Sequence, residues 1–304
     1  MSRMTSKDEW EAHIHCLRSE ITLDSNRDVV TTGKELWSLI ERTIITLAKK
    51  GLETGSLGLL FSGGIDSTII AFVLKKHSIP FKAVSIGFHD NPAQKYPDDL
   101  ASADKIADSL EFDFTPVVYD FRQIESLFEE TARALGKSLI NTVNIGVGSV
   151  ELAGLKSLKE LDPFITHVFG GLGSEEIFAG YKRHADATDV HDECWNGLKL
   201  MYERDLLREL ALSSYVGVDL LVPFLDEDVI RYAMTIPDSL KISSESSKII
   251  LREAAFAHGG LNMTFSRRPK KAAQYGSRTH HALKKLSSKK GFGSINEYIS
   301  SFLY

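Results

Sequence analysis

The chain has 304 residues, of which 43% are hydrophobic. That is enough to bury a large core, as one domain or as one domain with a helical extension. The chain carries 36 lysine and arginine residues against 41 aspartate and glutamate residues, for a formal net charge of −5. This mildly acidic balance gives no electrostatic reason to expect nucleic acid or an anionic membrane as a partner.

The cysteines and the lengths of the apolar runs indicate the cellular compartment of the protein. Cys16 and Cys194 lie far apart and form neither a CxxC pair nor a metal-ligand cluster, which is typical of proteins in a reducing compartment. The start of the chain has no apolar run like that of a signal peptide, and no run reaches the roughly 20 residues that span a bilayer. We therefore expect a cytoplasmic protein without a membrane-spanning segment.

The sequence of residues 1–61 predicts a helix followed by a buried strand. Residues 1–30 are polar, charged and weakly periodic, and predict an irregular or loosely helical lead-in. From Glu35 apolar residues recur at helical spacing, and Gly51 supplies a signal for the end of the helix. The apolar run Leu57–Phe61 is too short for a helix and suits a buried parallel strand.

Helices and strands are expected to alternate after this strand. Further strands are predicted over 81–86, 112–118 and 167–169, and helices over 67–76, 98–110, 121–135 and 149–161. This alternation predicts an α/β fold, a parallel twisted sheet with helices on both faces. Strand signals fade beyond Tyr181, where helical patterns over 194–212 and 246–256 predict a mostly helical C-terminal portion.

The expected domain organisation is three consecutive segments. A helical lead-in takes residues 1–55, the α/β core takes residues 56–190, and the helical C-terminal portion takes residues 191–304. The lysine-rich stretch 284–290 resembles a solvated charged face.

The hexapeptide Ser62–Ser67, SGGIDS, lies where the first strand passes into a helix. Backbone amides and the helix dipole make such a junction an anion site. Gly63 and Gly64 allow close approach of the backbone to a phosphate, while Ser62, Ser67 and Thr68 can donate hydroxyl hydrogen bonds. A carboxylate such as Asp66 beside a polyphosphate makes sense if it holds Mg²⁺.

The plain alternative is a glycine turn whose serine and aspartate cap the next helix. Neither the Walker A spacing nor a GxGxxG turn is present here, so neither a P-loop kinase nor a Rossmann dehydrogenase is favoured.

The whole hexapeptide resembles the PP-loop of N-type ATP pyrophosphatases. Three later blocks resemble the synthetase domain of asparagine synthetases and related β-lactam-forming enzymes. These blocks are Val84–Phe88, Phe169–Tyr181 and Val218–Lys241. With the loop they cover roughly residues 57–277 in the family's order, and the resemblance implies the PP-loop ATP pyrophosphatase fold.

The resemblance implies a reaction in which a substrate carboxylate attacks the α-phosphate of ATP and pyrophosphate leaves. An amine or ammonia then displaces AMP. ATP and Mg²⁺ are the implied cofactors, with Asp66 and Glu175 at the positions of the family's metal-binding aspartates. The implied nucleotide-binding residues are Leu60, Ser62, Gly63, Gly64, Asp66, Ser67, Thr68, Ile86, Gly170 and Gly171.

In the family, a lysine near the end of the domain contacts the α-phosphate region, and the matching region of this chain is 267–277. Lys270 and Lys271 are the candidates for this catalytic role beside Asp66, although one alignment leaves Ala272 at the position. Lys248 and Arg252 also resemble a family helix, and an exposed basic pair is the alternative for them.

The resemblance weakens at the substrate end. Asparagine synthetases use an N-terminal cysteine for glutamine hydrolysis, whereas Ser2 stands here and only about 55 residues precede the PP-loop. We therefore expect ammonia from solution or from a separate glutaminase subunit. Leu172 replaces a family glutamate near the intermediate, and Leu221 replaces a family arginine, so we expect an altered pocket for the carboxylate substrate.

Three functional classes remain. An adenylating amide-forming ligase is favoured, with a small-molecule carboxylate and an amine or ammonia as substrates. A tRNA-modifying PP-loop enzyme usually shows catalytic cysteines or a basic extension, which are not evident here. A non-catalytic nucleotide-binding scaffold would not need the carboxylates of Asp66 and Glu175. The sequence leaves the oligomeric state open, including a homo-oligomer, and no membrane partner is expected.

Overall fold

The computed structural model describes residues 6–89, 97–267 and 277–303. These residues cluster into two compact units that interleave along the chain. The first unit takes residues 1–50, 170–206 and 222–268, and the second takes residues 51–169, 207–221 and 269–304. The three consecutive segments expected from the sequence follow another division and stay a prediction.

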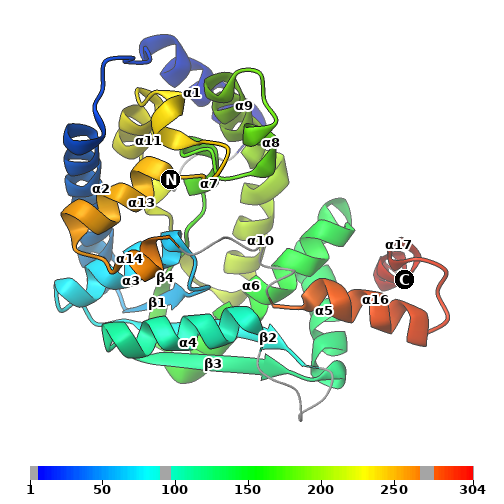
Figure 1. The fold of residues 1–304 in the computed structure, drawn as a ribbon. Helices are drawn as coiled ribbons and strands as arrows, with labels where there is room; N and C mark the ends of the chain where they lie inside the picture. The colour runs from blue at the N-terminus through cyan, green and yellow to red at the C-terminus, as the bar shows by residue number, and fades with distance from the viewer. Residues whose placement is uncertain (1–5, 90–96, 268–276, 304) are drawn as a thin grey trace. The chain divides into compact units, whose positions relative to one another are not determined.

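The second unit is built on a parallel sheet of five strands in the order β3-β2-β1-β4-β5 (Figure 1). The strands are β1 (Ser56–Leu60), β2 (Lys82–Phe88), β3 (Phe114–Tyr119), β4 (Ile165–Phe169) and β5 (Asp219–Leu221). Leu60 of β1 lies opposite Val84 of β2, and Leu59 lies opposite Phe169 of β4. The predicted α/β fold with a parallel sheet is confirmed.

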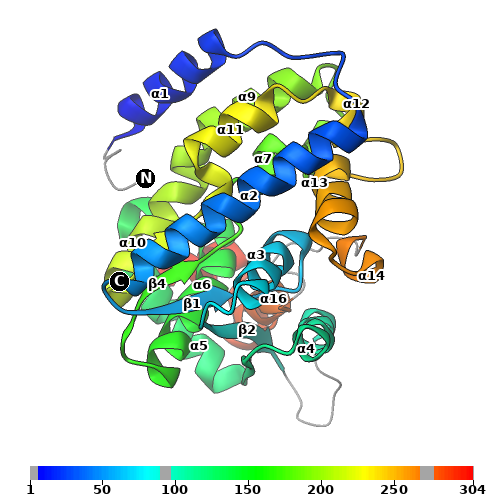
Figure 2. The same cartoon turned by 90° about the vertical axis from the view of Figure 1, so that its left-hand side faces the viewer.

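Helices cover both faces of this sheet. The described helices of this unit are α3 (Ile65–Lys76), α4 (Asp98–Leu110), α5 (Phe121–Leu135), α6 (Thr142–Leu161), α10 (Leu207–Val216), α16 (Thr279–Lys289) and α17 (Ile295–Ser300), with single 3₁₀ turns at Lys137–Leu139 and Ser301–Leu303. A Cβ added at Gly87 would meet Leu100 of α4, whereas Ile86 packs in the core that α5 and α6 build. Because neighbouring residues of a strand point to opposite faces, α4 and α6 cover opposite sides. Figure 2 shows α3 beside α4.

The first unit is helical in its described part. Its helices are α1 (Lys7–Glu20), α2 (Val29–Leu52, whose last two residues belong to the second unit), α7 (Ser174–Ile177), α8 (Lys182–Ala185), α9 (Val190–Met201), α11 (Glu227–Met234), α12 (Asp238–Lys241), α13 (Ile249–Glu253) and α14 (Met263–Ser266). Two π-helical turns follow α9 and α13, at Tyr202–Leu206 and Ala254–Gly259, and Pro223–Leu225 is a 3₁₀ turn. The Trp10 indole of α1 donates to the carbonyl oxygen of Leu198 at 2.8 Å.

Several boundaries differ from the sequence-based expectations. The lead-in contains a regular helix, α1, which begins where the Ser6 side chain accepts from the Glu9 amide. Helix α6 begins seven residues before the predicted Ser149, because Asn141 caps it by accepting from the Asn144 amide. Beyond Tyr181, where the strand signals of the sequence fade, the described residues are mostly helical, and the short strand β5 follows α10.

The predicted helix over 194–212 is not one regular α-helix. It consists of α9, a π-helical turn and α10, which follow one another without a break. The described part of the chain holds no helix long and apolar enough to cross a membrane.

Candidate functional site

The phosphate-loop candidate connects β1 to α3 in the second unit, at the carboxyl end of β1. Gly63 has a φ of 66°, a left-handed conformation in which a side chain would be strained, so glycine is required there. The Ser62 hydroxyl accepts from the Gly64 amide at 3.2 Å, and the Ser67 hydroxyl donates to the Gly64 carbonyl oxygen at 3.2 Å. These contacts hold a tight loop at the start of α3.

The start of α3 suits an anion. The N-cap residue is Gly64, which supplies no side-chain cap, and the first turn of a helix carries the positive end of its dipole. Ser62 is exposed, whereas Thr68 is fully buried and its hydroxyl has no hydrogen-bond partner among the described residues. A phosphate contact from Thr68 therefore stays a prediction.

Asp66 lies in the first turn of α3 and is half-buried. A carboxylate at this place interacts favourably with the helix dipole, which is a structural reason for its presence. It also keeps partial contact with solvent, so its oxygens fit the preference of Mg²⁺ for carboxylate and water ligands.

Leu60 and Ile86 face α6. A Cβ added at Gly154 of α6 would lie 2.5 Å from Leu60 Cδ2 and 3.7 Å from Ile86 Cγ1. Because both side chains pack into the core, a contact with a nucleotide would have to come from their main-chain atoms. Their predicted role in nucleotide binding stays a prediction.

The glycine-rich segment after β4 begins the second part of the first unit. Gly170 has open space around it, whereas Gly173 has a φ of 95° and leads into α7. Leu172 between them is half-buried, and Leu221 in the second unit is buried at the end of β5. At both positions where the sequence predicts an altered substrate pocket, the side chain is therefore apolar and at least half-buried.

Gly173 offers a test of this turn. An added Cβ would lie 2.4 Å from Leu225 Cδ2, and the left-handed backbone would be strained as well. Gly260→Ala is the matched control, because Gly260 also has a positive φ of 86° but nothing within 4 Å of an added Cβ. We expect Gly260→Ala to cost about 1 kcal/mol from strain alone. Gly173→Ala should cost roughly 1–2 kcal/mol more from overpacking. Urea denaturation measures both, and equal losses would contradict the close packing at Gly173.

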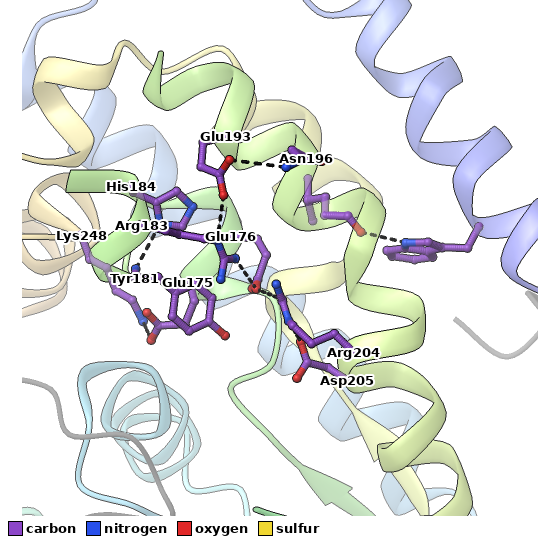
Figure 3. A network of polar contacts seen from close by, with 12 residues as sticks. Glu175, Glu176, Tyr181, Arg183, His184, Glu193, Asn196, Arg204, Asp205 and Lys248 are labelled. Carbon is purple, nitrogen blue, oxygen red and sulfur yellow. Dashed lines mark hydrogen bonds and ion pairs between the residues drawn. The ribbon is translucent and has the colours of Figure 1, made fainter. Parts of the chain in front are cut away.

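Glu175 forms a buried ion pair in the first unit. Its carboxylate contacts the ammonium of Lys248 (Figure 3). The same ammonium also donates to the Ser174 hydroxyl at 2.8 Å. Glu175 is 7% exposed and Lys248 is 2% exposed. The exposed basic pair considered for Lys248 and Arg252 was wrong: Arg252 is half-buried and donates to the carbonyl oxygens of Ser247 and Ser266 at 2.9 and 2.6 Å.

A second acidic group follows at once. Glu176 is 1% exposed, and its carboxylate contacts the guanidinium of Arg204 and lies 3.6 Å from that of Arg183 (Figure 3). Arg204 also donates to Asp205 at 2.6 Å. Burial raises the pKa of the Glu176 carboxyl to about 7, and the neighbouring Arg204 cation opposes this rise without cancelling it.

Tyr181 and His184 complete this network. The Arg183 guanidinium lies 4.1 Å from the centre of the Tyr181 ring, and His184 Nδ1 accepts from the Tyr181 amide at 3.1 Å. Burial lowers the pKa of His184 to about 4, so its imidazole is neutral at pH 7. Glu176 and its arginine partners were missed from the sequence. The consecutive glutamates at 175 and 176 are the one local signal, because the arginines come from other segments.

Lys270 and Lys271 lie outside the described residues, so their predicted catalytic role is carried forward as a prediction. Within 6–89, 97–267 and 277–303, no group of three or more histidine, cysteine, aspartate or glutamate residues could hold a metal ion. Cys194 is buried and Cys16 is exposed, and both are free thiols.

Comparison with known proteins places these features in a family. A family model described as asparagine synthase matches residues 48–195 and 184–290. A Methanocaldococcus jannaschii protein, provisionally named glutamine-hydrolyzing asparagine synthetase 1, is 27% identical over 297 residues, which cover 82% of this chain and 51% of that protein. The Homo sapiens glutamine-hydrolyzing asparagine synthetase is 29% identical over 216 residues, which cover 67% of this chain and 37% of that protein.

The chain spans about half or less of the length of these curated relatives. Among solved structures, an NH3-dependent NAD synthetase from Campylobacter jejuni is 14% identical. The match covers 88% of this chain and 93% of that chain with a TM-score of 0.40.

Proposed function

Because the chain belongs to the asparagine synthase family, we propose that it is an ATP-dependent amide-forming ligase that adenylates a carboxylate and releases pyrophosphate. The observation that carries the proposal is the SGGIDS loop between β1 and α3, inside the region that the family model matches. An adenylating enzyme needs a site that binds pyrophosphate, and a helix start after a glycine turn is suited to bind such an anion, which supports the proposal.

The second unit supplies the nucleotide part of this proposal. We assign the pyrophosphate of ATP to the amides of the loop and to the hydroxyls of Ser62 and Ser67. Asp66 would hold a magnesium ion, which when bound would neutralise charge on the leaving pyrophosphate. Lys270 or Lys271 would contact the α-phosphate region, as the family resemblance predicts. An amine or ammonia would then attack the acyl-adenylate and release AMP.

A carboxylate-dependent ATP–pyrophosphate exchange assay tests the proposal. The panel should contain amino acids, other small carboxylates, nucleosides and tRNA, with ammonia added in parallel and the product mass recorded. We expect exchange with one class of carboxylate and an amide product after ammonia is added. Transfer of AMP to tRNA would replace the proposal by RNA modification. Nucleotide binding without exchange would indicate a scaffold.

Leu172 predicts the substrate preference. An apolar side chain cannot offer the charge or hydrogen bond that a glutamate offers a polar intermediate, and an unpaired polar group costs about 1–3 kcal/mol. We therefore expect aspartate to be a poor substrate and Leu172→Glu to raise aspartate-dependent pyrophosphate release by about 10-fold. Leu221 stands where the family has an arginine, and the absence of that arginine should limit this gain.

Leu172→Gln is the matched control, because it has a similar size without the charge. It should raise aspartate-dependent release less than Leu172→Glu. Rapid asparagine formation by the unchanged protein from aspartate, ATP and ammonia would show that Leu172 does not exclude aspartate.

A further inference from the structure

A buried ion pair joins α7 to the residue before α13. The Lys248 ammonium contacts the Glu175 carboxylate (Figure 3). It also donates to Ser174 in the same short helix as Glu175. Both charged side chains are withdrawn from solvent. Charges at such depth are stable only when they are paired, so each of the two side chains depends on the other.

The backbone around this pair is specialised. Lys248 has φ 56° and ψ 34°, a left-handed conformation that residues with a Cβ seldom adopt unless their surroundings hold them. A Cβ added at Gly180 would lie 1.9 Å from Glu175 Oε2 and 2.5 Å from Lys248 Cε. The pair therefore fills the space that the missing side chain of Gly180 leaves.

This environment does not fit a magnesium ligand at Glu175. Mg²⁺ keeps several waters in an octahedral shell and needs a carboxylate with room beside it. The Glu175 carboxylate is instead buried, is in contact with an ammonium, and lies against Gly180. Asp66 is less buried than Glu175, and it lies in the first turn of α3, directly after the glycine loop.

We propose that Lys248 is the permanent counter-ion of Glu175, so that this carboxylate anchors Lys248 and the turn of α7 instead of binding magnesium. In this role Lys248 and Glu175 are positioning residues, and Asp66 is the metal carboxylate. The inference uses the proposed function only in assuming that the nucleotide binds together with a divalent cation.

The first experiment measures cation binding without turnover. Free Mn²⁺ is followed by electron paramagnetic resonance during titration of the full chain, with and without a non-hydrolysable ATP analogue. We expect Glu175→Gln to bind Mn²⁺ with the nucleotide within about 2-fold of the unchanged protein. Asp66→Asn should bind it about 10-fold to 100-fold more weakly. A loss in Glu175→Gln as large as that in Asp66→Asn would overturn the proposal.

The second experiment separates the ion pair from a purely structural effect. Thermal melting with and without Mn²⁺ compares Glu175→Gln, Lys248→Met and the double variant. Each single change removes the opposite charge of the ion pair and should lower Tm by several degrees, roughly 4 °C or more. The double variant, in which neither charge of the pair is left to bury, should melt above both single variants.

Lys248→Met also frees the Glu175 carboxylate. It should gain stabilisation by Mn²⁺ that neither the unchanged protein nor the double variant has, an effect that lost packing alone would not produce. If Lys248→Met does not fold, the comparison of Glu175→Gln with the double variant still decides: an equal or lower Tm in the double variant would refute the pairing. Since no substrate enters either experiment, failure of the ligase assay leaves both results interpretable.

Discussion

Asp66→Asn should reduce carboxylate-dependent pyrophosphate release by roughly 100-fold or more while the protein keeps its fold. Asparagine has the size of aspartate, and it can preserve local hydrogen bonds at a helix start, but it does not supply the anionic oxygen that Mg²⁺ prefers. Pyrophosphate release at saturating ATP and circular dichroism melting are the two measurements.

Asp104→Asn is the matched control. Asp104 is an exposed carboxylate on α4 of the same unit, so the substitution removes the same charge away from the loop. Its activity should stay within about 2-fold of the unchanged protein, since surface substitutions have small effects. Full activity in Asp66→Asn would remove Asp66 from the reaction.

The stability of the first unit should depend on pH through two buried groups whose pKa values shift in opposite directions on folding. The pKa of Glu176 rises from 4.5 to about 7 on folding, mainly because of burial. Its contribution to stability is therefore complete below pH 4.5 and is lost as the pH rises to about 7, an effect of about 3 kcal/mol. The pKa of His184 falls from 6.5 to about 4, so its contribution is present above pH 6.5 and is lost on acidification.

These slopes oppose each other between about pH 4.5 and 6.5, so the unchanged protein should show a shallow profile of unfolding free energy there. Glu176→Gln removes one slope and should make stability fall as the pH is lowered. His184→Asn, whose amide oxygen can still accept from the Tyr181 amide, should make stability fall as the pH is raised. Urea denaturation at half-unit pH steps measures both. Identical slopes in all three proteins would disprove the assignment.

Much of the second unit could be predicted from the sequence because its signals are local. The predicted bounds of α4 and α5 match the structure. For α5 the reason is a capping box between Asp120 and Gln123 at one end and Gly136 at the other. The strand β5 could not be predicted in this way: it has three residues, and pairing with β4 rather than local pattern makes it a strand.

In the candidate site, too, the features with local sequence signals could be predicted, and those that depend on distant residues could not. The SGGIDS loop is readable because a strand, two glycines and a helix start follow one another in the sequence. The burial of Lys248 is not readable, since its partner Glu175 lies 73 residues earlier. The π-helical turn that carries Arg204 and Asp205 has no sequence signature comparable to a cap or a turn motif.

The interleaved course of the chain has a consequence for synthesis on the ribosome. The Asp24 amide donates to the carbonyl oxygen of Thr235, and the Tyr232 hydroxyl donates to Glu35 of α2. At about 5–20 residues per second, the N-terminal helices wait roughly 10–40 s before these partners are translated. During that interval the apolar face of α2, which includes Trp37 and Ile40, has no native partner from the later segments. Nascent chains of this protein should therefore be clients of ribosome-associated chaperones, and arrest peptides placed before residue 235 should report an N-terminal region that is still open to protease.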